Sequence, residues 1–585
     1  MIKIFKNLKA KEWLFIAISV CFIVTQVWLD LKLPDYMSEI TRLVQTPGSQ
    51  MRDIVEAGAY MMLCALGSLV ASIVVAGFAA RISSNFSARV RSRLFEKVQS
   101  FSMKEINNFS TPSLITRTTN DVTQVQMLIV MGMQVLIKAP IMAVWAICKI
   151  TNKGVEWSMA TGGAVAILLV VIVTCVLIAL PRFKRIQSLT DNLNRVAREN
   201  LTGIRVVRAY NAEQYEEDKF ATANEELTSN QRITNSVMTI VMPTITLVMN
   251  GLSLAIYWIG AVLINEAALS DKMSLFSNMI VFSSYAMQVI MAFMMLVMIF
   301  ILLPRASVAA KRINEVLDTK LSIKDGTVTE SPIGMSGEVE FKNVSFKYPD
   351  ASDYVLEDIS FTAHRGETVA IIGATGCGKS TLMNLIPRFY DVTEGEVLVN
   401  GVDVRRYKQS SLRDKIGYVS QKATLFEGDI TSNINFGTSS KTNITDADVV
   451  DAAYIAQASE FIEKVDGQYK GYVSQGGTNL SGGQKQRLSI ARAIARHPEI
   501  LIFDDSFSAL DYKTDRKLRS ILKKEIIGTT MLIVAQRIGT IKDADKIIVL
   551  DEGRIVGMGK HEELMKNCSV YQEIAYSQLS KEELA

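Results

Sequence analysis

The sequence has 585 residues, of which 49% are hydrophobic, and a mean hydropathy of +0.21. A chain of this kind is too long for one ordinary domain and too apolar to be soluble along its whole length. Its formal net charge is only +4, and the basic residues are dispersed, so no nucleic-acid partner is expected.

The apolar excess lies before residue 305, in six segments that each approach the roughly 20 residues needed to cross a bilayer. No small-residue cleavage site follows the first segment, which therefore reads as a retained helix rather than a secretory signal. The six predicted spans are residues 13–31, 58–80, 127–147, 157–180, 238–264 and 273–303.

Lysines and arginines gather before the first span, between the second and third, and between the fourth and fifth. Because cytoplasmic loops collect basic residues, we expect a multi-pass protein of the cell membrane with both termini in the cytoplasm. The two inner loops are long and have continuous helical periodicity, which predicts helices that extend well beyond the bilayer.

The six cysteines are scattered without pairing or metal-ligand spacing, which is typical of reduced structural thiols. With only three histidines in the chain, neither a zinc site nor a two-metal site is expected.

Two features of the spans are left open. Lys138, in the third span, is a costly buried cation that serves either a structural or a functional role. We expect no acidic side chain inside any span, hence no proton relay, and ATP as the energy source. Methionines in the sixth span are either adaptable core or a soft wall for varied apolar ligands; they are Met287, Met291, Met294, Met295 and Met298.

After residue 303 the sequence turns polar, passes through a helical linker, and from about Gly337 alternates strands with helices. This order predicts an α/β domain. The predicted organisation is a membrane domain in residues 1–318, a linker in 319–336 and a nucleotide-binding domain in 337–585.

The segment from Gly373 to Ser380 fits the pattern G-x-x-x-x-G-K-S, between a predicted strand (368–372) and an apolar helix. Glycines let backbone N–H groups close around phosphate, Lys379 reaches the outer phosphates, and the Ser380 hydroxyl suits magnesium. The chain is therefore expected to bind ATP with Mg²⁺. The candidate residues of this phosphate loop are Gly373, Thr375, Gly376, Cys377, Gly378, Lys379, Ser380 and Thr381.

Two further motifs complete a nucleotide-binding set. Asp504 ends the apolar strand 500–503, where a carboxylate can hold magnesium. Leu480 and the four residues Ser481, Gly482, Gly483 and Gln484 lead into a long helix, whose start offers a second phosphate cradle.

With these motifs the chain resembles an ATP-binding-cassette exporter half-transporter. The resemblance implies a membrane all-α six-helix exporter domain fused to an α/β P-loop nucleotide-binding domain. It also places Tyr348 against adenine, Gln421 at magnesium beside Ser380 and Asp504, and Asp511 at the dimer interface. Segments 114–121 and 199–208 resemble the sequences around the two coupling helices of the family.

Three positions depart from the family pattern. Asp505 stands where a glutamate should polarise water, and its carboxylate falls about 1 to 1.5 Å short. Gln536 stands at the switch histidine and cannot carry positive charge. Gln475 replaces a usual glutamate near the coupling region. Asp505 and Gln536 together predict a site that binds ATP and hydrolyses it poorly.

In this family each ATP lies between the phosphate loop of one chain and the Ser-Gly-Gly motif of the other. The resemblance therefore implies an obligate heterodimer with a second half-transporter that carries the missing glutamate and histidine. The residues expected to face the ATP of that partner are Ser481, Gly482, Gly483, Gln484 and Asp511.

Resemblance to heterodimeric bacterial multidrug exporters implies hydrophobic, often cationic, small molecules as the exported class. A lipid or lipopeptide exporter of the same architecture is the nearest alternative. An ATP-gated channel or a regulatory subunit also remains open.

Overall fold

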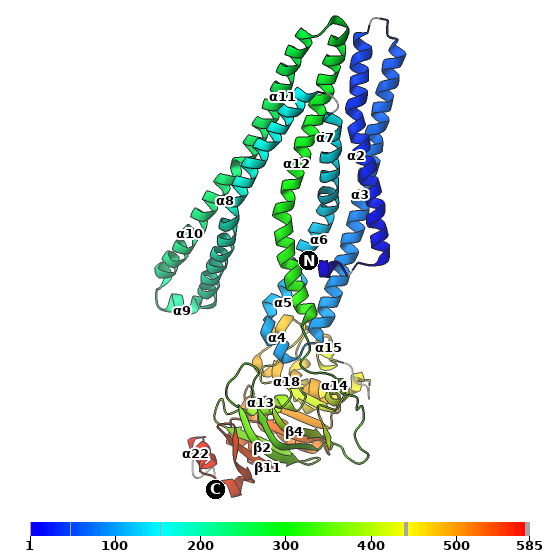
Figure 1. Ribbon diagram of the computed structural model, residues 1–585. Helices are drawn as coiled ribbons and strands as arrows, with labels where there is room; N and C mark the ends of the chain where they lie inside the picture. Colours follow the sequence, from blue (N-terminus) through cyan, green and yellow to red (C-terminus); the bar gives the residue numbers. More distant parts are fainter. Residues whose placement is uncertain (1, 7, 47, 152–153, 438–442, 579–585) are drawn as a thin grey trace. The chain divides into compact units, whose positions relative to one another are not determined.

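The computed structural model describes residues 2–6, 8–46, 48–151, 154–437 and 443–578. The chain forms two compact units, of which the first (residues 1–99 and 111–319) is helical. The second, residues 100–110 and 320–585, combines strands and helices (Figure 1).

Among the described residues, six helices or helix series in the first unit are long and apolar enough to cross a membrane. Five of them contain a predicted span, and the sixth, Asp271–Leu296, overlaps the predicted span 273–303. The six-helix membrane domain is therefore confirmed. Its helices are α1 (Ile2–Phe5), α2 (Ala10–Gln45), α3 (Met51–Gln99), α5 (Thr111–Thr118), α6 (Asn120–Gly132), a π-helical turn η1 (Met133–Ile137), α7 (Lys138–Thr151), α8 (Val155–Thr202), α9 (Ile204–Ala209), α10 (Glu213–Thr239), α11 (Val241–Glu266) and α12 (Leu269–Asp318).

Several of these helices exceed the thickness of a bilayer. α3 has 49 residues and α8 has 48, so each is about 70 Å long at 1.5 Å per residue, against a hydrocarbon core of about 30 Å. α8 and α10 run side by side, and the short helix α9 joins them (Figure 1). The long helices predicted for the inner loops are thus present.

Large apolar side chains lie on the outside of the bundle, as lipid contact requires. Leu66, Leu177 and Trp258 are 52%, 66% and 72% exposed, whereas Trp157 and Phe282 pack together inside. Of the methionines in α12, Met291 is exposed and Met287, Met294 and Met295 are half-buried. The side chain of Met298 lies outside the described residues.

The expectation that the spans lack acidic residues is wrong. Asp30 lies in α2 within the first predicted span, and its Oδ2 is 3.1 Å from Nζ of Lys138 on α7. A second pair joins the same two helices, with Asp35 Oδ2 2.9 Å from Lys149 Nζ. A cation inside the apolar bundle is costly without a counter-ion, so the chain places an aspartate opposite each of these lysines.

The second unit has two larger sheets with an apolar core between them, and a two-stranded sheet of β7 and β8. The four-stranded sheet has the order β2-β1-β4-β5 and the six-stranded sheet the order β12-β11-β3-β10-β9-β6. This confirms the predicted α/β domain. The strands are β1 (Val339–Phe346), β2 (Leu356–Ala363), β3 (Thr368–Gly373), β4 (Glu394–Val399), β5 (Val402–Asp403), β6 (Ile416–Val419), β7 (Gly428–Asp429), β8 (Tyr472–Val473), β9 (Ile500–Asp504), β10 (Thr530–Val534), β11 (Lys546–Asp551) and β12 (Arg554–Gly559).

A second core lies between the six-stranded sheet and the helices that follow β6 and β9. The helices of this unit are α4 (Met103–Phe109), α13 (Lys379–Leu385), α14 (Gln409–Arg413), α15 (Ile430–Ile434), α16 (Asp446–Ile455), α17 (Ser459–Ile462), α18 (Gly482–Ile494), α19 (Tyr512–Glu525), α20 (Ile538–Ile541), α21 (His561–Asn567) and α22 (Ser569–Gln578), with 3₁₀ turns η2 (Gln468–Lys470) and η3 (Gln475–Gly477).

α4 belongs to this second unit although it comes from the first half of the sequence. Its Asn107 Nδ2 donates to the hydroxyl of Tyr390 at 3.3 Å, and its Glu105 Oε1 accepts from the Ser322 N–H at 3.0 Å. The coupling-helix resemblance at 114–121 therefore falls on α5 and α6, just after the helix that contacts the nucleotide-binding fold.

Candidate functional site

The candidate site lies at one edge of the six-stranded sheet. Strands β3, β10, β9 and β6 are neighbours and run parallel, so their carboxyl ends meet at the same edge, where ligands of open α/β sheets bind. The loops that leave these strands carry, in sheet order, the phosphate loop, Gln536, the pair Asp504 and Asp505, and Gln421. The topology thus gathers four segments that are distant in sequence.

The phosphate loop is shaped by glycine. Gly378 has φ +98°, a left-handed conformation that disfavours any side chain, and an added Cβ would lie 2.8 Å from Leu356 Cδ2. The buried Lys379 donates from Nζ to the carbonyl oxygens of Gly373 at 2.8 Å and Ala374 at 2.7 Å. These bonds hold the cation against the loop.

Ser380 and Asp504 meet as expected of a shared magnesium site. The Ser380 hydroxyl donates to Asp504 Oδ1 at 2.7 Å. Burial raises the pKa of Asp504, although the bond from Ser380 opposes that effect. Both groups are hard oxygen ligands, and Mg²⁺ prefers one or two such protein ligands together with substrate phosphates. Among the described residues, no cluster of three His, Cys, Asp or Glu side chains could hold a metal alone.

Asp505 is held in place by two side-chain amides. Its Oδ2 accepts from Gln536 Nε2 at 2.8 Å and from Gln421 Nε2 at 3.2 Å. Burial raises the pKa of this carboxyl as well, while the bond from Gln421 lowers it. The backbone of Asp505 is also unusual, with φ +48°, a region that Asp and Asn enter more readily than longer side chains.

Tyr348 and Thr381 are brought together at the other side of the phosphate loop. Their hydroxyl oxygens lie 3.0 Å apart. The Tyr348 ring packs edge-to-face with Phe346 and Tyr390, at centroid distances of 5.0 and 5.3 Å. These contacts fix the position of the aromatic ring for which an adenine contact is predicted.

The Ser-Gly-Gly motif forms the start of α18. Ser481 Oγ accepts from the Gln484 N–H at 3.3 Å, and Gln484 Oε1 accepts from the Ser481 N–H at 2.8 Å. This reciprocal cap uses the two side chains to order the helix start. Ser481 and Gly482 are exposed and Gly483 is partly exposed, so their backbone can face an anion from outside.

Asp511 caps the next helix. Its Oδ1 accepts from the Thr514 N–H at 3.0 Å at the start of α19, a bond that lowers the pKa of this exposed carboxyl. Among the described residues, no hydrogen bond joins Asp511 or the Ser481 turn to the phosphate loop. The predicted residues therefore fall into two groups, one at the sheet edge and one at the starts of α18 and α19. Gln475 is exposed on η3, which precedes the Ser481 turn.

Sequence reasoning missed two residues that contact the sheet-edge group. The Tyr418 hydroxyl donates to Asn384 Oδ1 at 3.2 Å and lies 3.5 Å from Asp504 Oδ2, and burial raises its pKa. A polar tyrosine in the apolar strand just before Gln421 was a usable signal. Gln578 in α22 donates to the Gln536 carbonyl at 2.7 Å and accepts from the Ile538 N–H at 2.9 Å. No local pattern indicates that contact.

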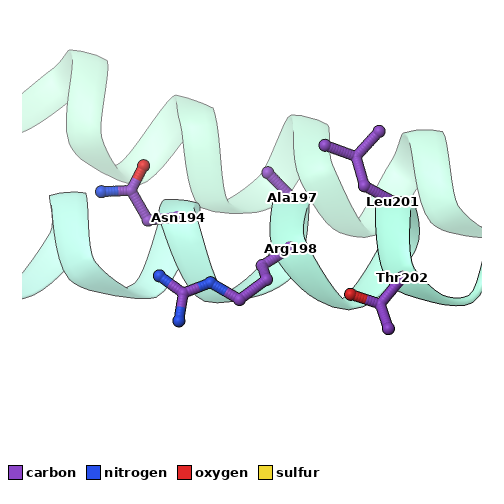
Figure 2. A pocket seen from close by; sticks show the side chains of 5 residues that line it. All are labelled: Asn194, Ala197, Arg198, Leu201 and Thr202. Atoms are coloured by element: carbon purple, nitrogen blue, oxygen red, sulfur yellow. The ribbon is translucent and has the colours of Figure 1, made fainter. Parts of the chain in front are cut away.

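A broad hollow of about 610 Å³ elsewhere in the chain does not resemble a site. All the residues that line it come from α8 (Figure 2). They are Asn194, Ala197, Arg198, Leu201 and Thr202.

Comparison with known families agrees with this geometry. Residues 14–293 match the family described as the ABC transporter transmembrane region, and residues 356–508 match the family described as ABC transporter. This chain belongs to the ABC transporter family and is a half-transporter. One membrane domain and one nucleotide-binding domain occur in a single polypeptide, as the sequence motifs predict.

Relatives and a solved structure cover most of the half-transporter. An ABC transporter ATP-binding protein of Mycobacterium tuberculosis is 42% identical over 468 residues, 80% of this chain and 79% of the relative. One from Bacillus subtilis is 36% identical over 482 residues, 80% of each chain. An ATP-dependent lipid A-core flippase of Aromatoleum aromaticum is 34% identical over 399 residues, 68% of this chain and 65% of the flippase.

The solved structure of a bacterial Atm1-family ABC exporter with ATP bound aligns with a TM-score of 0.79. The alignment covers 97% of this chain and 99% of that exporter, at 24% sequence identity. At this level of identity the likeness concerns the fold alone.

Proposed function

We propose that this half-transporter is the subunit of a heterodimeric exporter whose own ATP site hydrolyses poorly. The observation that carries the proposal is the environment of Asp505, whose Oδ2 accepts from the amides of Gln421 and Gln536. A general base must reach the proton of an attacking water. Here the carboxylate is one methylene shorter than glutamate, and one of its oxygens already accepts two hydrogen bonds.

Gln536 adds a second deficit. A side-chain amide donates hydrogen bonds but carries no positive charge, so it stabilises developing phosphate charge less than an imidazolium would. Because both groups that act on the water and the outer phosphate are altered, bound ATP turns over slowly at this edge. The phosphate loop itself keeps its lysine, serine and glycines.

This chain keeps the residues that it needs to bind ATP and Mg²⁺. Ser380 and Asp504 would hold the metal, with Gln421 nearby, and bound Mg²⁺ would neutralise phosphate charge. Lys379 would leave its loop carbonyls for the outer phosphates, and the backbone around Gly376 and Gly378 would enclose the inner ones. These residues bind and orient the nucleotide.

The Ser481 turn gives this chain its second role. Its residues agree with the family pattern, and among the described residues no hydrogen bond joins its exposed cap to the phosphate loop of the same chain. It would complete the hydrolytic site of a partner that carries the glutamate and histidine. In a homodimer of this chain, both ATP sites would hydrolyse ATP poorly. The functional assembly is therefore a heterodimer.

The exported class is hydrophobic or amphipathic compounds, moved out of a bacterial cell across its plasma membrane, with both termini cytoplasmic. ATP binding would draw the two nucleotide-binding domains together, and hydrolysis at the competent site would reset them. A lipid substrate is the second candidate. It is favoured by one observation, the similarity to relatives that are named as ATP-dependent lipid A-core flippases.

Purification tests the assembly first. The tagged chain, isolated from its native membrane, should bring with it a second half-transporter that mass spectrometry identifies. The pair should hydrolyse ATP, and this chain reconstituted alone should stay near background. Brisk ATP hydrolysis and transport in liposomes by this chain alone would refute the proposal.

A further inference from the structure

A small cavity lies inside the membrane bundle, lined by residues of the first unit alone. Its volume is about 140 Å³, well above the roughly 10 to 15 Å³ that a single water molecule needs. Helices α2, α3, α7 and α12 and the π-helical turn η1 all contribute to its wall. The lining residues are Ile23, Gln26, Ser72, Val75, Gln134, Val135, Lys138 and Met295.

The π-helical turn sets the polar part of this wall. η1 (Met133–Ile137) carries Gln134 and Val135, and Lys138 follows it directly. A π-helical turn inserts an extra residue into a helix and is frequent at functional sites. Lys138, the span lysine that the sequence singled out, lines the cavity directly after this turn, and Met295 of α12 lines it as well.

Lys138 is the one charged side chain among the residues that line the cavity. Each carboxylate oxygen of Asp30 accepts one hydrogen bond, Oδ1 from Ser68 and Oδ2 from Lys138. Lys138 makes this single bond and has two further N–H groups. Gln26 is only 9% exposed, and its amide has no hydrogen-bond partner among the described residues. A ligand with an anionic group, whose oxygens accept from the N–H groups of Lys138, therefore suits this lining.

We propose that this cavity binds the phosphate-bearing head group of an amphiphile, with Lys138 and the amides of Gln26 and Gln134 as donors. The proposal rests on the proposed export of amphipathic compounds and names the chemistry of their head group. Ile23, Val75, Val135 and Met295 give the first methylenes of the alkyl chain an apolar wall. At about 140 Å³ the cavity admits a head group and leaves the rest of the compound outside.

Asp30 competes with such a ligand for Lys138. The ion pair keeps the empty site neutral, and a phosphate oxygen would take over the ammonium while Asp30 retains the Ser68 hydroxyl. Removing the aspartate charge should therefore strengthen phosphate binding. A purely structural ion pair predicts the opposite, because breaking either side would then damage the bundle equally.

Native mass spectrometry of the full chain in dodecyl maltoside can measure this binding. The probes are dodecyl phosphate and dodecyltrimethylammonium, which share an alkyl chain and differ in the charge of the head group. The chain should bind dodecyl phosphate at least about tenfold more tightly, which corresponds to the loss of one charged hydrogen bond. Lys138→Met should remove that preference, and Lys138→Arg should retain most of it.

Lys149→Met is the matched control, because Lys149 lies on the same helix, pairs with Asp35 and does not line the cavity. It should leave phosphate binding unchanged, while Asp30→Asn should tighten it. Equal effects of Lys138→Met and Lys149→Met, a preference for the cationic probe, or weakened binding in Asp30→Asn would each overturn the proposal.

If Lys138→Met does not fold, the double variant Asp30→Asn with Lys138→Met removes both charges and keeps the site neutral. It should fold and should not bind dodecyl phosphate above dodecyltrimethylammonium. Retained preference in that variant would also overturn the proposal. No step of the experiment needs ATP, a partner or transport, so its result is independent of whether the proposed function holds.

Discussion

The two ends of the nucleotide-binding fold differ in how closely they keep the family pattern. At the sheet edge, Asp505 and Gln536 stand where the family pattern predicts a glutamate and a histidine, and they hydrogen-bond to each other. At the start of α18, Ser481 and Gln484 keep the pattern and form a reciprocal cap. Because two of the three changes fall on groups that would act on water and phosphate, we propose that hydrolysis can be lost while binding is kept, so that one chain holds one ATP and completes the site of another.

The largest effect should come from disrupting the start of α18, where Ser481 and Gln484 keep the family pattern. Ser481→Arg removes the cap and places a bulky side chain where the exposed N–H groups of α18 would meet the ATP of the partner. We expect ATPase activity of the heterodimer to fall by about 100-fold, the scale of losing an oriented donor of phosphate charge.

Thr445→Arg is the control for that change. Thr445 caps α16 in a similar way, accepting from the Asp448 N–H, but it lies at a helix that carries none of the predicted site residues. Its loss should cost about 1 kcal/mol of stability and leave ATPase activity within about twofold. Similar losses from the two variants would show that capping, and not phosphate contact, is what Ser481 provides.

Lys379→Ala tests whether the sheet edge still binds nucleotide. Lys379 is the one cation held against the phosphate loop by the carbonyls of Gly373 and Ala374. Its removal should weaken nucleotide binding at this site by about tenfold or more, the value of a charged hydrogen bond, and should slow transport. Photolabelling with an azido-ATP would measure the first effect, and unchanged transport would mean that the site is idle.

Restoring the family residues at positions 505 and 536 should raise ATP hydrolysis at the sheet edge. Asp505→Glu with Gln536→His should raise turnover at this site several-fold, measured in a heterodimer whose partner lacks its glutamate. Asp505→Glu alone should do less, because the left-handed backbone at this position suits the longer side chain poorly and the switch residue would still be neutral. A single change that restores full activity would show that the two deficits are not coupled.

The smallest effect should come from the C-terminal helix. Gln578 bridges the Gln536 carbonyl and the Ile538 N–H, so Gln578→Ala should loosen the switch loop and change the apparent affinity for ATP by about twofold, with kcat unaffected. Gln578→Asn should not rescue it, since the shorter amide cannot span both groups. A fall in kcat at constant affinity would contradict this role.

Much of this architecture follows from the sequence. Apolar runs of about 20 residues predict the six spans, because a helix of that length is needed to cross a bilayer. The pattern around Gly373 and Lys379 predicts a strand, a loop and a helix, because a phosphate loop joins a strand to a helix. The meeting of Asp505 with Gln536 also follows, since neighbouring parallel strands end at one edge.

Other contacts depend on how distant helices pack. Asp30 looks like an isolated polar residue at the end of an apolar run until α7 brings Lys138 beside it. The bridge from Gln578 to Gln536 joins segments about 40 residues apart through side-chain geometry that no period or propensity encodes. The position of α4 was missed for the same reason. Its contact residues Tyr390 and Ser322 are more than 200 residues away from it in the sequence.

The central claim is that the two ATP sites of the heterodimer are unequal, and single-site replacements measure this most directly. ATPase activity should be compared between Asp505→Asn in this chain and replacement of the corresponding glutamate in the partner by glutamine. We predict that Asp505→Asn retains at least about half of the activity, while the partner variant loses about 100-fold or more. Equal losses from the two replacements would contradict the account.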